Sequence, residues 1–348
     1  MLPSGVFNTK YELDLAILRT RTQWVLLALG LVAVFSMPLY TSTYWMVQIT
    51  TLAITIVAVL GLHVLTGLCG QISIGHAAFM GVGAYTAGIL ATNYGVNGWL
   101  CPPICALSAG VAGLIFGLPC FRLKGFYLAV STLAASFIIE WCIKHFDTVT
   151  GGYRYKSVEP LSIGGVEFYS NAAFFSLVIV VLILATYVAK NIQRTAAGRA
   201  FVAIRDNELA AEVSGINIFR YKMLAFFVGC AFAGVAGWLW AYQQTTITPT
   251  DFQLSNSLLY LGVLVIGGWG STAGVYMGAT FLWFLDIMIR DQVAPALEGI
   301  IPEVHYLGAI TIGVVVIAFV ILEPRGLAYR WEKIKMYYRL HPYSFWAR

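Results

Sequence analysis

Charged side chains are scarce in this chain. Asp, Glu, Lys and Arg together make up 11% of its 348 residues, whereas hydrophobic residues make up 59%. Ordinary soluble domains carry about 25% charged and roughly 45–50% apolar residues. The charged residues also collect into patches and leave long uncharged runs, near the roughly 20 residues needed to cross a membrane as a helix. This composition excludes an ordinary soluble domain and predicts an all-α, polytopic membrane protein.

Several chemical signatures are also missing. The chain has no GxxxxGK[ST] phosphate-binding loop and no Gly-Lys dipeptide, so it has no evident means of binding ATP. Its six cysteines form no CxxC pair, and we predict neither a metal site nor a catalytic site. The cysteines are interpreted as small packing residues, although a disulfide between Cys101 and Cys105 stays open.

Ten apolar runs, some of them interrupted by glycine, are expected to be transmembrane helices. They cover residues 24–40, 45–66, 72–92, 99–118, 125–143, 172–189, 223–243, 254–268, 272–290 and 304–322. The first run lacks a small-residue cleavage site and is expected to be a retained span. The predicted organisation is an N-terminal segment (1–23), a membrane domain (24–322) with loops at 144–171 and 190–222, and a C-terminal tail (323–348).

Lys and Arg are distributed unevenly over the segments between these spans. With the N-terminus on the inside, 17 of the 21 basic residues fall in inside segments and four fall outside. Because cytoplasmic segments of membrane proteins are enriched in Lys and Arg, both termini and loop 190–222 are predicted to be cytoplasmic, and loop 144–171 extracytoplasmic. The net charge of +5 then reflects membrane topology, and it gives no reason to expect nucleic-acid binding.

One polar stretch is unlike the apolar runs around it: GRAFVAIRDNELAAEVSGINIFRYK at 198–222. Leu209, Val213 and Ile216 recur at the spacing of one face of a helix. The charged residues of a second face are Arg205, Glu208 and Glu212. The polar stretch is therefore predicted to contain a short amphipathic helix.

The ends of this predicted helix carry signals of their own. Asp206 or Asn207 can act as the N-cap, and Gly215 suits the left-handed residue after the last turn. A helix of about eight residues is roughly 12 Å long, which is too short to be stable alone in water. It must pack against the bilayer, against this protein's own loops, or against a cytoplasmic partner.

Two glycine-rich segments resemble each other: GLCGQISIGHAAFMG at 67–81 and GGWGSTAGVYMG at 267–278. Such runs occur in interrupted helices whose exposed N–H groups face a transported solute, and they also permit close packing of helices in lipid. Both interpretations stay open. The candidate residues of a translocation pathway are Gly67, Gly70, Gln71, Ser73, Gly75, His76, Gly267, Gly268, Gly270 and Ser271.

The polar stretch resembles the cytoplasmic loop of permease subunits of bacterial ABC importers, in the LivM-like branch of the branched-chain amino acid (HAAT) family. Four further motifs are similar to that family and follow in the expected order. They are LTGLCGQISIGHAAFMGVGAYTAGIL at 65–90, RLKGFYLAVSTLA at 122–134, VIGGWGSTAGVYMGA at 265–279 and EPRGL at 323–327. The resemblance extends from about residue 45 over nearly all of the remaining chain.

The resemblance implies a permease subunit of an ATP-driven, binding-protein-dependent importer in the bacterial inner membrane, carrying branched-chain or other amino acids. Its partners would be a homologous LivH-like permease subunit, two cytoplasmic ATPase subunits that hold ATP and Mg²⁺, an extracytoplasmic solute-binding protein and membrane lipid. This chain would bind no cofactor and catalyse no reaction. Members of the same architecture import urea or aromatic and carboxylic acids, so the substrate stays open.

The resemblance also implies that the short helix couples the subunit to an ATPase. The expected coupling residues are Gly198, Arg199, Arg205, Asp206, Asn207, Glu208, Leu209, Ala210, Ala211, Glu212 and Gly215. Importer permeases in general carry E-A-A-x-x-x-G at this place, and alignment on Gly215 puts Leu209 where the acidic residue is expected. Charges at the rim of the helix would set its register on the partner.

Two other classes of protein predict different sequences. A secondary transporter or channel would carry ionisable residues deep in several spans, whereas the middles of these spans are nearly free of them. An intramembrane protease would need a nucleophile and a base, for which Ser73 and His76 are the only tempting pair. The surrounding ISIGH is not the GxSG turn of rhomboid-type proteases. The sequence therefore favours the permease.

Overall fold

The computed structural model describes residues 21–96, 100–120, 126–152, 156–158, 162–163, 166–167, 170–293, 295 and 307–340. The parts of the predicted termini before residue 21 and after residue 340 lie outside the described residues, as does most of the predicted loop 144–171 beyond residue 152.

The described chain is almost entirely helical. Its elements in the first half are α2 (Arg21–Ser36), the 3₁₀ turn η1 (Met37–Leu39), α3 (Thr43–Leu62), the π-helix η2 (His63–Leu68), α4 (His76–Tyr94), α5 (Cys101–Cys120), α6 (Phe126–His145), α7 (Asp147–Thr150), β1 (Lys156–Ser157), β2 (Ser162–Ile163) and β3 (Val166–Glu167). Those in the second half are α8 (Asn171–Ile192), α9 (Ala196–Asp206), α10 (Glu208–Val213), α11 (Ile218–Gln244), β4 (Thr246–Ile247), the 3₁₀ turn η3 (Pro249–Phe252), α12 (Leu254–Gly267), α13 (Thr272–Met288), the π-helix η4 (Ile289–Val293), α15 (Leu307–Leu322) and α16 (Gly326–Leu340).

The helices confirm an all-α, multi-pass membrane protein. A helix lies in each of the ten predicted ranges, but in the described residues six are long and apolar enough to cross a membrane alone. They are Thr43–Leu68, Cys101–Leu118, Tyr127–His145, Asn171–Ile192, Ile218–Gln244 and Thr272–Val293. α15 and α16 pass the same test of length and hydropathy only as a pair, with a bend of 47° between them. Fewer than the ten predicted transmembrane helices therefore meet the criterion of length and hydropathy. Helices α2 and α12 are short, and α4 is rich in glycine.

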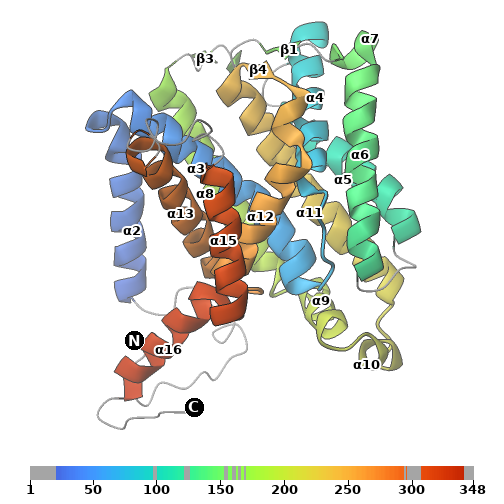
Figure 1. Ribbon diagram of the computed structural model, residues 1–348, viewed down its shortest axis with the longest axis vertical. Helices are drawn as coiled ribbons and strands as arrows, with labels where there is room; N and C mark the ends of the chain where they lie inside the picture. Colours follow the sequence, from blue (N-terminus) through green and yellow to red (C-terminus); the bar gives the residue numbers. More distant parts are fainter. Residues whose placement is uncertain are drawn as a thin grey trace.

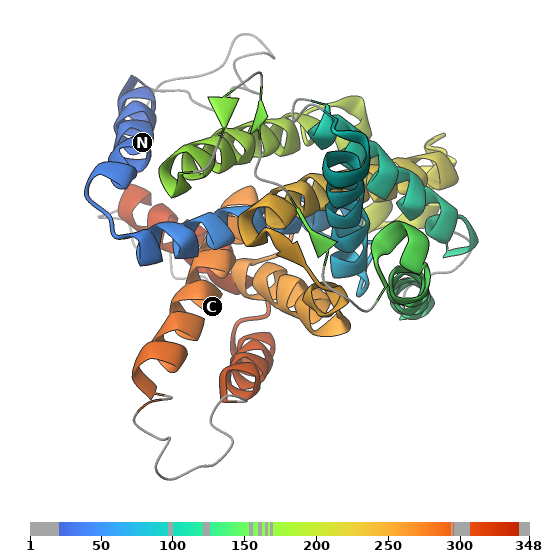
Figure 2. The same cartoon turned by 90° about the horizontal axis from the view of Figure 1, so that it is seen from above.

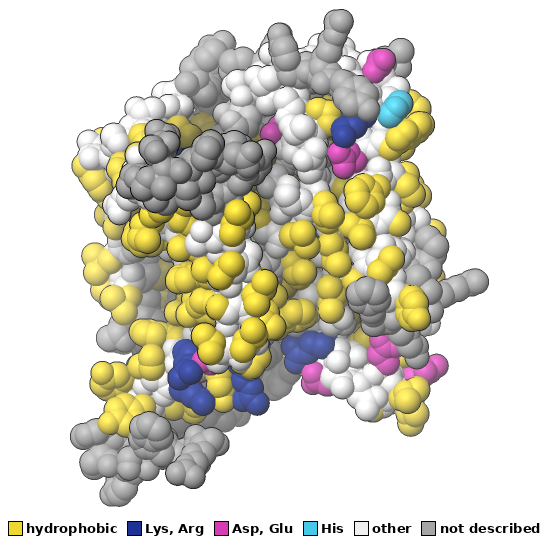
Figure 3. Space-filling view, in the orientation of Figure 1, with side chains coloured by type: hydrophobic (Ala, Val, Ile, Leu, Met, Phe, Trp, Pro, Cys, Tyr) yellow, Lys and Arg dark blue, Asp and Glu magenta, His cyan; other side chains and the backbone are white. Residues whose placement is uncertain are grey.

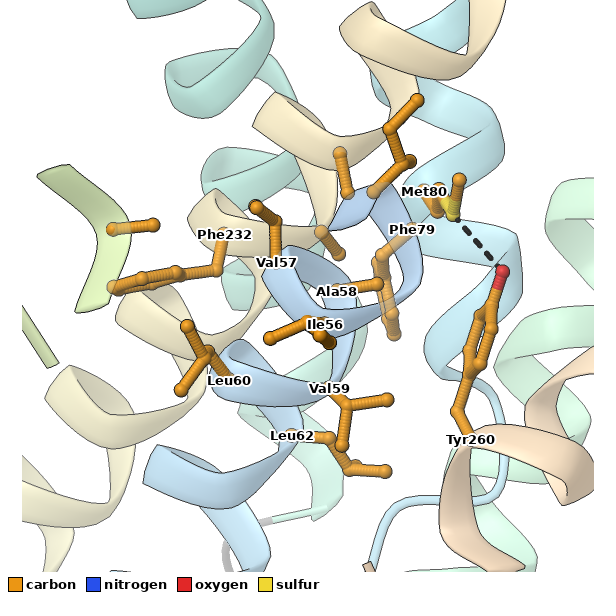
Figure 4. Packing of buried hydrophobic residues seen from close by; sticks show 14 of the residues in the cluster. Ile56, Val57, Ala58, Val59, Leu60, Leu62, Phe79, Met80, Phe232 and Tyr260 are labelled. Carbon is orange, nitrogen blue, oxygen red and sulfur yellow. Dashed lines mark hydrogen bonds between the residues drawn. The ribbon is translucent and has the colours of Figure 1, made fainter. Parts of the chain in front are cut away.

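Helices α3 and α11 lie at the centre of the bundle. α11 contacts α3, α4 and α5, while α3 also contacts α8, α12 and α13. A Cβ added to Gly61 of α3 would lie 2.5 Å from the carbonyl oxygen of Gly229 in α11, so only glycine permits this approach. Side chains of α3 are buried against several neighbours at once, among them Phe79 and Phe232 (Figure 4). In contrast, α2 lies at the edge of the bundle (Figure 2) and exposes most of its apolar side chains.

The two ends of the bundle differ. One end carries α9, α10 and α16, whereas the opposite end carries α7 and the pairing of β1 with β4 (Figure 1). On the face drawn in Figure 3, hydrophobic side chains form a broad band, and Lys and Arg gather mostly at the end with α9, α10 and α16. The described parts of loop 190–222 and of the C-terminal tail thus share one basic end, as the distribution of Lys and Arg in the sequence predicts.

Candidate functional site

The polar stretch folds into two consecutive helices rather than one. α9 begins after Thr195, whose Oγ1 accepts a hydrogen bond from the Gly198 N–H at 3.2 Å. Phe201 and Ile204 of α9 are buried in the core. The prediction of a single short helix missed α9, although its N-cap threonine and the apolar pair three residues apart were visible in the sequence.

The chain then turns at Asn207 and forms α10. The Asn207 Oδ1 accepts from the Ala210 N–H at 3.1 Å, so Asn207 is the N-cap, one of the two residues predicted. α10 has six residues rather than about eight, since a Schellman-type end begins at Ser214. There the Ile216 N–H bonds the Ala211 carbonyl at 3.0 Å, and Gly215 has a φ of +82°. The predicted left-handed role of Gly215 is confirmed.

One face of α10 is left open. Leu209 is 68% exposed and Val213 is 91% exposed, whereas Ala211 is buried against this chain. Ile216, predicted to share the apolar face, instead packs against the core. An apolar pair this exposed on a short helix is poorly stabilised within the described chain, so α10 presents Leu209 and Val213 outward as a small apolar surface.

Arg205, at the end of α9, reaches into the bundle. Its Nη1 donates to the Gly67 carbonyl at 3.0 Å, while Nε and Nη2 both donate to the Asp206 Oδ1. A Cβ on Gly70 would lie 3.0 Å from the Arg205 side chain, so the arginine packs directly on the glycine-rich segment. Arg205 was predicted to be a rim charge facing a partner; in the described chain its guanidinium bonds the Gly67 carbonyl and the neighbouring Asp206.

Glu208 is also used inside the molecule. It forms an ion pair with Lys222, whose side chain is only 5% exposed at the start of α11. A buried ammonium needs a partner because its desolvation is costly, so Glu208 is held against α11 rather than free for a partner subunit. Among Arg205, Glu208 and Glu212, the three charges predicted at the rim, only Glu212 is exposed with no ion pair in the described part of the chain. Arg199, near the start of α9, donates to the Arg194 carbonyl at 3.0 Å.

The first glycine-rich segment contains a break in the helix. The π-helix η2 ends at Leu68, and residues 69–75, the first break, are not helical before α4 begins. The Thr66 Oγ1 donates to the Gln71 carbonyl at 2.9 Å, and Gly70 has a φ of +74°. π-Helical turns occur frequently at functional sites. The predicted interruption of a glycine-rich helix is thus present.

The amides at the start of α4 already have protein partners. The Ile74 N–H donates to the Thr132 Oγ1 at 3.0 Å, and the Ala77 N–H donates to the Ser257 Oγ at 2.9 Å. A Cβ on Gly75 would overlap the Thr132 carbonyl. Between the two interpretations left open by the sequence, this geometry favours close helix packing over an exposed anion site at this helix start.

Three polar side chains beside the first break are fully buried: Gln71, Ser73 and His76. The His76 imidazole Nε2 hydrogen-bonds the Ala58 carbonyl at 2.9 Å. Among the described residues, the Ser73 Oγ and the Gln71 Oε1 have no hydrogen-bond partner. Ser73 and His76 do not bond each other, so they do not form a nucleophile–base pair.

The second glycine-rich segment contains a second break at 268–271, between α12 and α13. Gly268 and Gly270 have φ values of +107° and +84°, and the Ser271 Oγ caps α13 by accepting from the Gly274 N–H at 3.3 Å. A Cβ on Gly67, at the end of η2, would lie 3.1 Å from the Gly270 amide nitrogen, so the two glycine-rich segments touch. The structure therefore brings the predicted pathway segments together, with Arg205 packed against both.

A cavity of about 550 Å³ opens beside the second break. It is lined by Arg205, by Arg325 just before α16, and by Tyr329 and Glu332 in the first turns of α16. Among the described residues, no group of His, Cys, Asp and Glu is placed to hold a metal ion. Cys101 and Cys105 are free thiols, which answers the disulfide question left open by the sequence.

Comparison with known proteins places these features in a family. Residues 43–321 match the family described as "Branched-chain amino acid transport system / permease component". The permease protein LivM of Escherichia coli is 34% identical over 270 residues, which cover 70% of this chain and 64% of LivM. The chain thus spans slightly less than two thirds of that relative's length.

More distant relatives carry other names. A probable branched-chain amino acid permease protein LivH of Methanocaldococcus jannaschii is 22% identical over 73% of this chain and 82% of its own length. The fructose import permease protein FrcC of Rhizobium meliloti is 25% identical over 78% of this chain and 77% of its own length. No solved structure matches. Since the family match covers most of the chain, this protein belongs to the family of branched-chain amino acid transport permease components.

Proposed function

We propose that this chain is the membrane-spanning permease subunit of an ATP-driven, binding-protein-dependent importer in the bacterial inner membrane. Its substrates are branched-chain or other amino acids. The observation that carries the proposal is the geometry of α10: two apolar side chains face outward, while Arg205 just before it bonds Gly67 in the first glycine-rich segment and Glu208 pairs with Lys222 of α11.

The mechanism follows from these contacts. Two cytoplasmic ATPase subunits bind ATP and Mg²⁺, and one of them receives the Leu209–Val213 surface of α10. Arg205 and the pair of Glu208 with Lys222 tie this region to the end of η2, directly before the first break, and to α11. Movement of α10 is thereby passed to the helices that meet at the breaks. A homologous LivH-like subunit completes the pathway, and an extracytoplasmic binding protein delivers the solute.

Two alternatives concern the substrate and the class of transporter. The same architecture imports urea or aromatic and carboxylic acids, and a secondary transporter or channel would work without any ATPase. Purification of the chain with the products of adjacent genes, followed by measurement of ATPase activity with solute-loaded binding protein, tests both. We expect branched-chain amino acids to raise the ATPase activity. Solute transport by the chain alone in liposomes would contradict the proposal.

The docking role of α10 has a direct test. Leu209→Asp combined with Val213→Asp places charge on the exposed surface without touching the core, so the chain should insert in the membrane normally but fail to co-purify with its ATPase. Leu209→Ile combined with Val213→Ile keeps the surface apolar and serves as the matched control. Full ATPase association in the aspartate variant would remove α10 from the interface.

A further inference from the structure

The last described helix, α16, leaves the bundle at a sharp bend. Its axis lies at 47° to α15, with Pro324 just before the bend. Gly326 has a φ of +73°, and a Cβ there would lie 2.5 Å from the Gly268 Cα in the second break. The first turn of α16 is therefore fixed against the second break, and the residues after the buried Ala328 extend away from it (Figure 1).

The extended part of α16 has an apolar stripe. Leu327, Trp331, Ile334 and Tyr338 follow the i, i+4, i+7, i+11 spacing, which puts them on one face of the helix. Leu327 packs against the core, but the other three side chains are exposed, Trp331 by 55%. Tyr and Trp rings are amphipathic and favour the boundary between hydrocarbon and water.

Basic residues border this stripe. Arg330 and Lys335 lie on its two sides, each about 70° from the centre of the stripe around the helix axis at 100° per residue. Lys333 lies over the Tyr329 ring, with its Nζ 4.9 Å from the ring centre. Within α16 the one acidic residue is Glu332, so the helix is strongly basic. A basic helix with an aromatic and aliphatic stripe suits a negatively charged membrane surface.

The position of α16 matches that surface. α15 carries no charged residue up to Leu322, so its end marks the edge of the hydrocarbon layer. At 47° to α15, each residue of α16 moves only about 1 Å further along the α15 axis, since the rise is 1.5 Å per residue along the helix itself. Trp331 then lies about 5 Å and Ile334 about 8 Å beyond the bend, within a headgroup layer roughly 5–8 Å thick.

α16 also lies on the opposite side of the bundle from α10, although both occupy the same end (Figures 1 and 2). The ATPase surface proposed for α10 therefore does not extend to the stripe of α16. We propose that α16 is an amphipathic anchor that inserts Trp331 and Ile334 among the lipids and binds anionic headgroups with its basic side chains. Through Gly326 and Gly268, this anchor holds the second break at a fixed depth.

Hydrogen exchange of the full-length chain in lipid nanodiscs tests the proposal. The exchange of the backbone amides of residues 329–340 is compared between discs of phosphatidylcholine alone and discs containing 30% phosphatidylglycerol. Each basic side chain near an anionic surface favours binding by roughly fivefold, so we expect at least tenfold slower exchange in the anionic discs. Lys333→Glu combined with Lys335→Glu should abolish this difference between the two lipids.

A second variant separates insertion from charge. Trp331→Ser combined with Ile334→Ser should accelerate exchange of these amides in both kinds of disc. Met336→Ser is the matched control, because Met336 is 51% exposed but lies on the opposite face of α16 and should leave the exchange unchanged. Equal exchange in detergent and in both discs would overturn the proposal. So would slowing that appears only after the ATPase is added, or only as the protein concentration rises and a second copy covers the stripe.

Discussion

Replacing Arg205 with alanine should separate ATPase docking from solute transport. The substitution removes the hydrogen bond from the Arg205 Nη1 to the Gly67 carbonyl and leaves the exposed Leu209 and Val213 in place. A hydrogen bond from a charged group contributes about 1.5–3 kcal/mol, and the pairing of Arg205 with the exposed Asp206 adds little. Because the Arg205 side chain is 34% exposed, the lower end applies, and about 1.5 kcal/mol corresponds to roughly a tenfold loss of transport rate.

The assay is transport by the assembled complex in proteoliposomes, with ATP hydrolysis measured in the same preparation. We expect ATPase association to stay normal while the solute transported per ATP falls roughly tenfold. Arg199→Ala is the matched control, because Arg199 lies on the same helix but bonds the Arg194 carbonyl instead of Gly67. Transport within twofold of the wild type in Arg205→Ala, or an equal loss in Arg199→Ala, would refute the assigned role of the contact with Gly67.

Three further substitutions test the packing around the breaks, each by thermal unfolding of the full chain in detergent. Ser257→Ala leaves the buried Ala77 N–H without its partner and should cost about 1–3 kcal/mol, whereas Ser257→Thr should cost less if the new methyl group fits. Glu208→Gln leaves the buried Lys222 without its ionic partner and should lower the free energy of unfolding by about 3 kcal/mol. Lys222→Met should lower it less, because the Glu208 left behind is partly exposed to solvent. Equal losses of stability in the two variants would contradict this reasoning. Gly326→Ala forces a left-handed alanine against the second break and should cost about 2 kcal/mol or more, and an unchanged melting temperature would show that the bend can relax.

Local signals carried much of the structure of the polar stretch. The Asn207 cap and the left-handed Gly215 follow from backbone chemistry within a few residues, so they were predictable. The partners of Arg205 and Glu208 could not be predicted, because charged residues have the same spacing in the sequence whether their helix face points to solvent or back into the bundle. The same holds for the first break. The sequence showed its glycines but could not show that the hydroxyl groups of Thr132 and Ser257 accept hydrogen bonds from the backbone amides there.

The sequence by itself determined that this protein is a helical, multi-pass membrane protein with its basic residues concentrated at one end. Hydrophobic runs and the distribution of Lys and Arg act locally, through the transfer of each segment between water and lipid, and need no knowledge of neighbouring helices. Only the tertiary structure decided that the two glycine-rich segments meet, and that Arg205 contacts Gly67 across 138 positions of the chain. Such contacts depend on how the helices pack in three dimensions, which no single segment specifies.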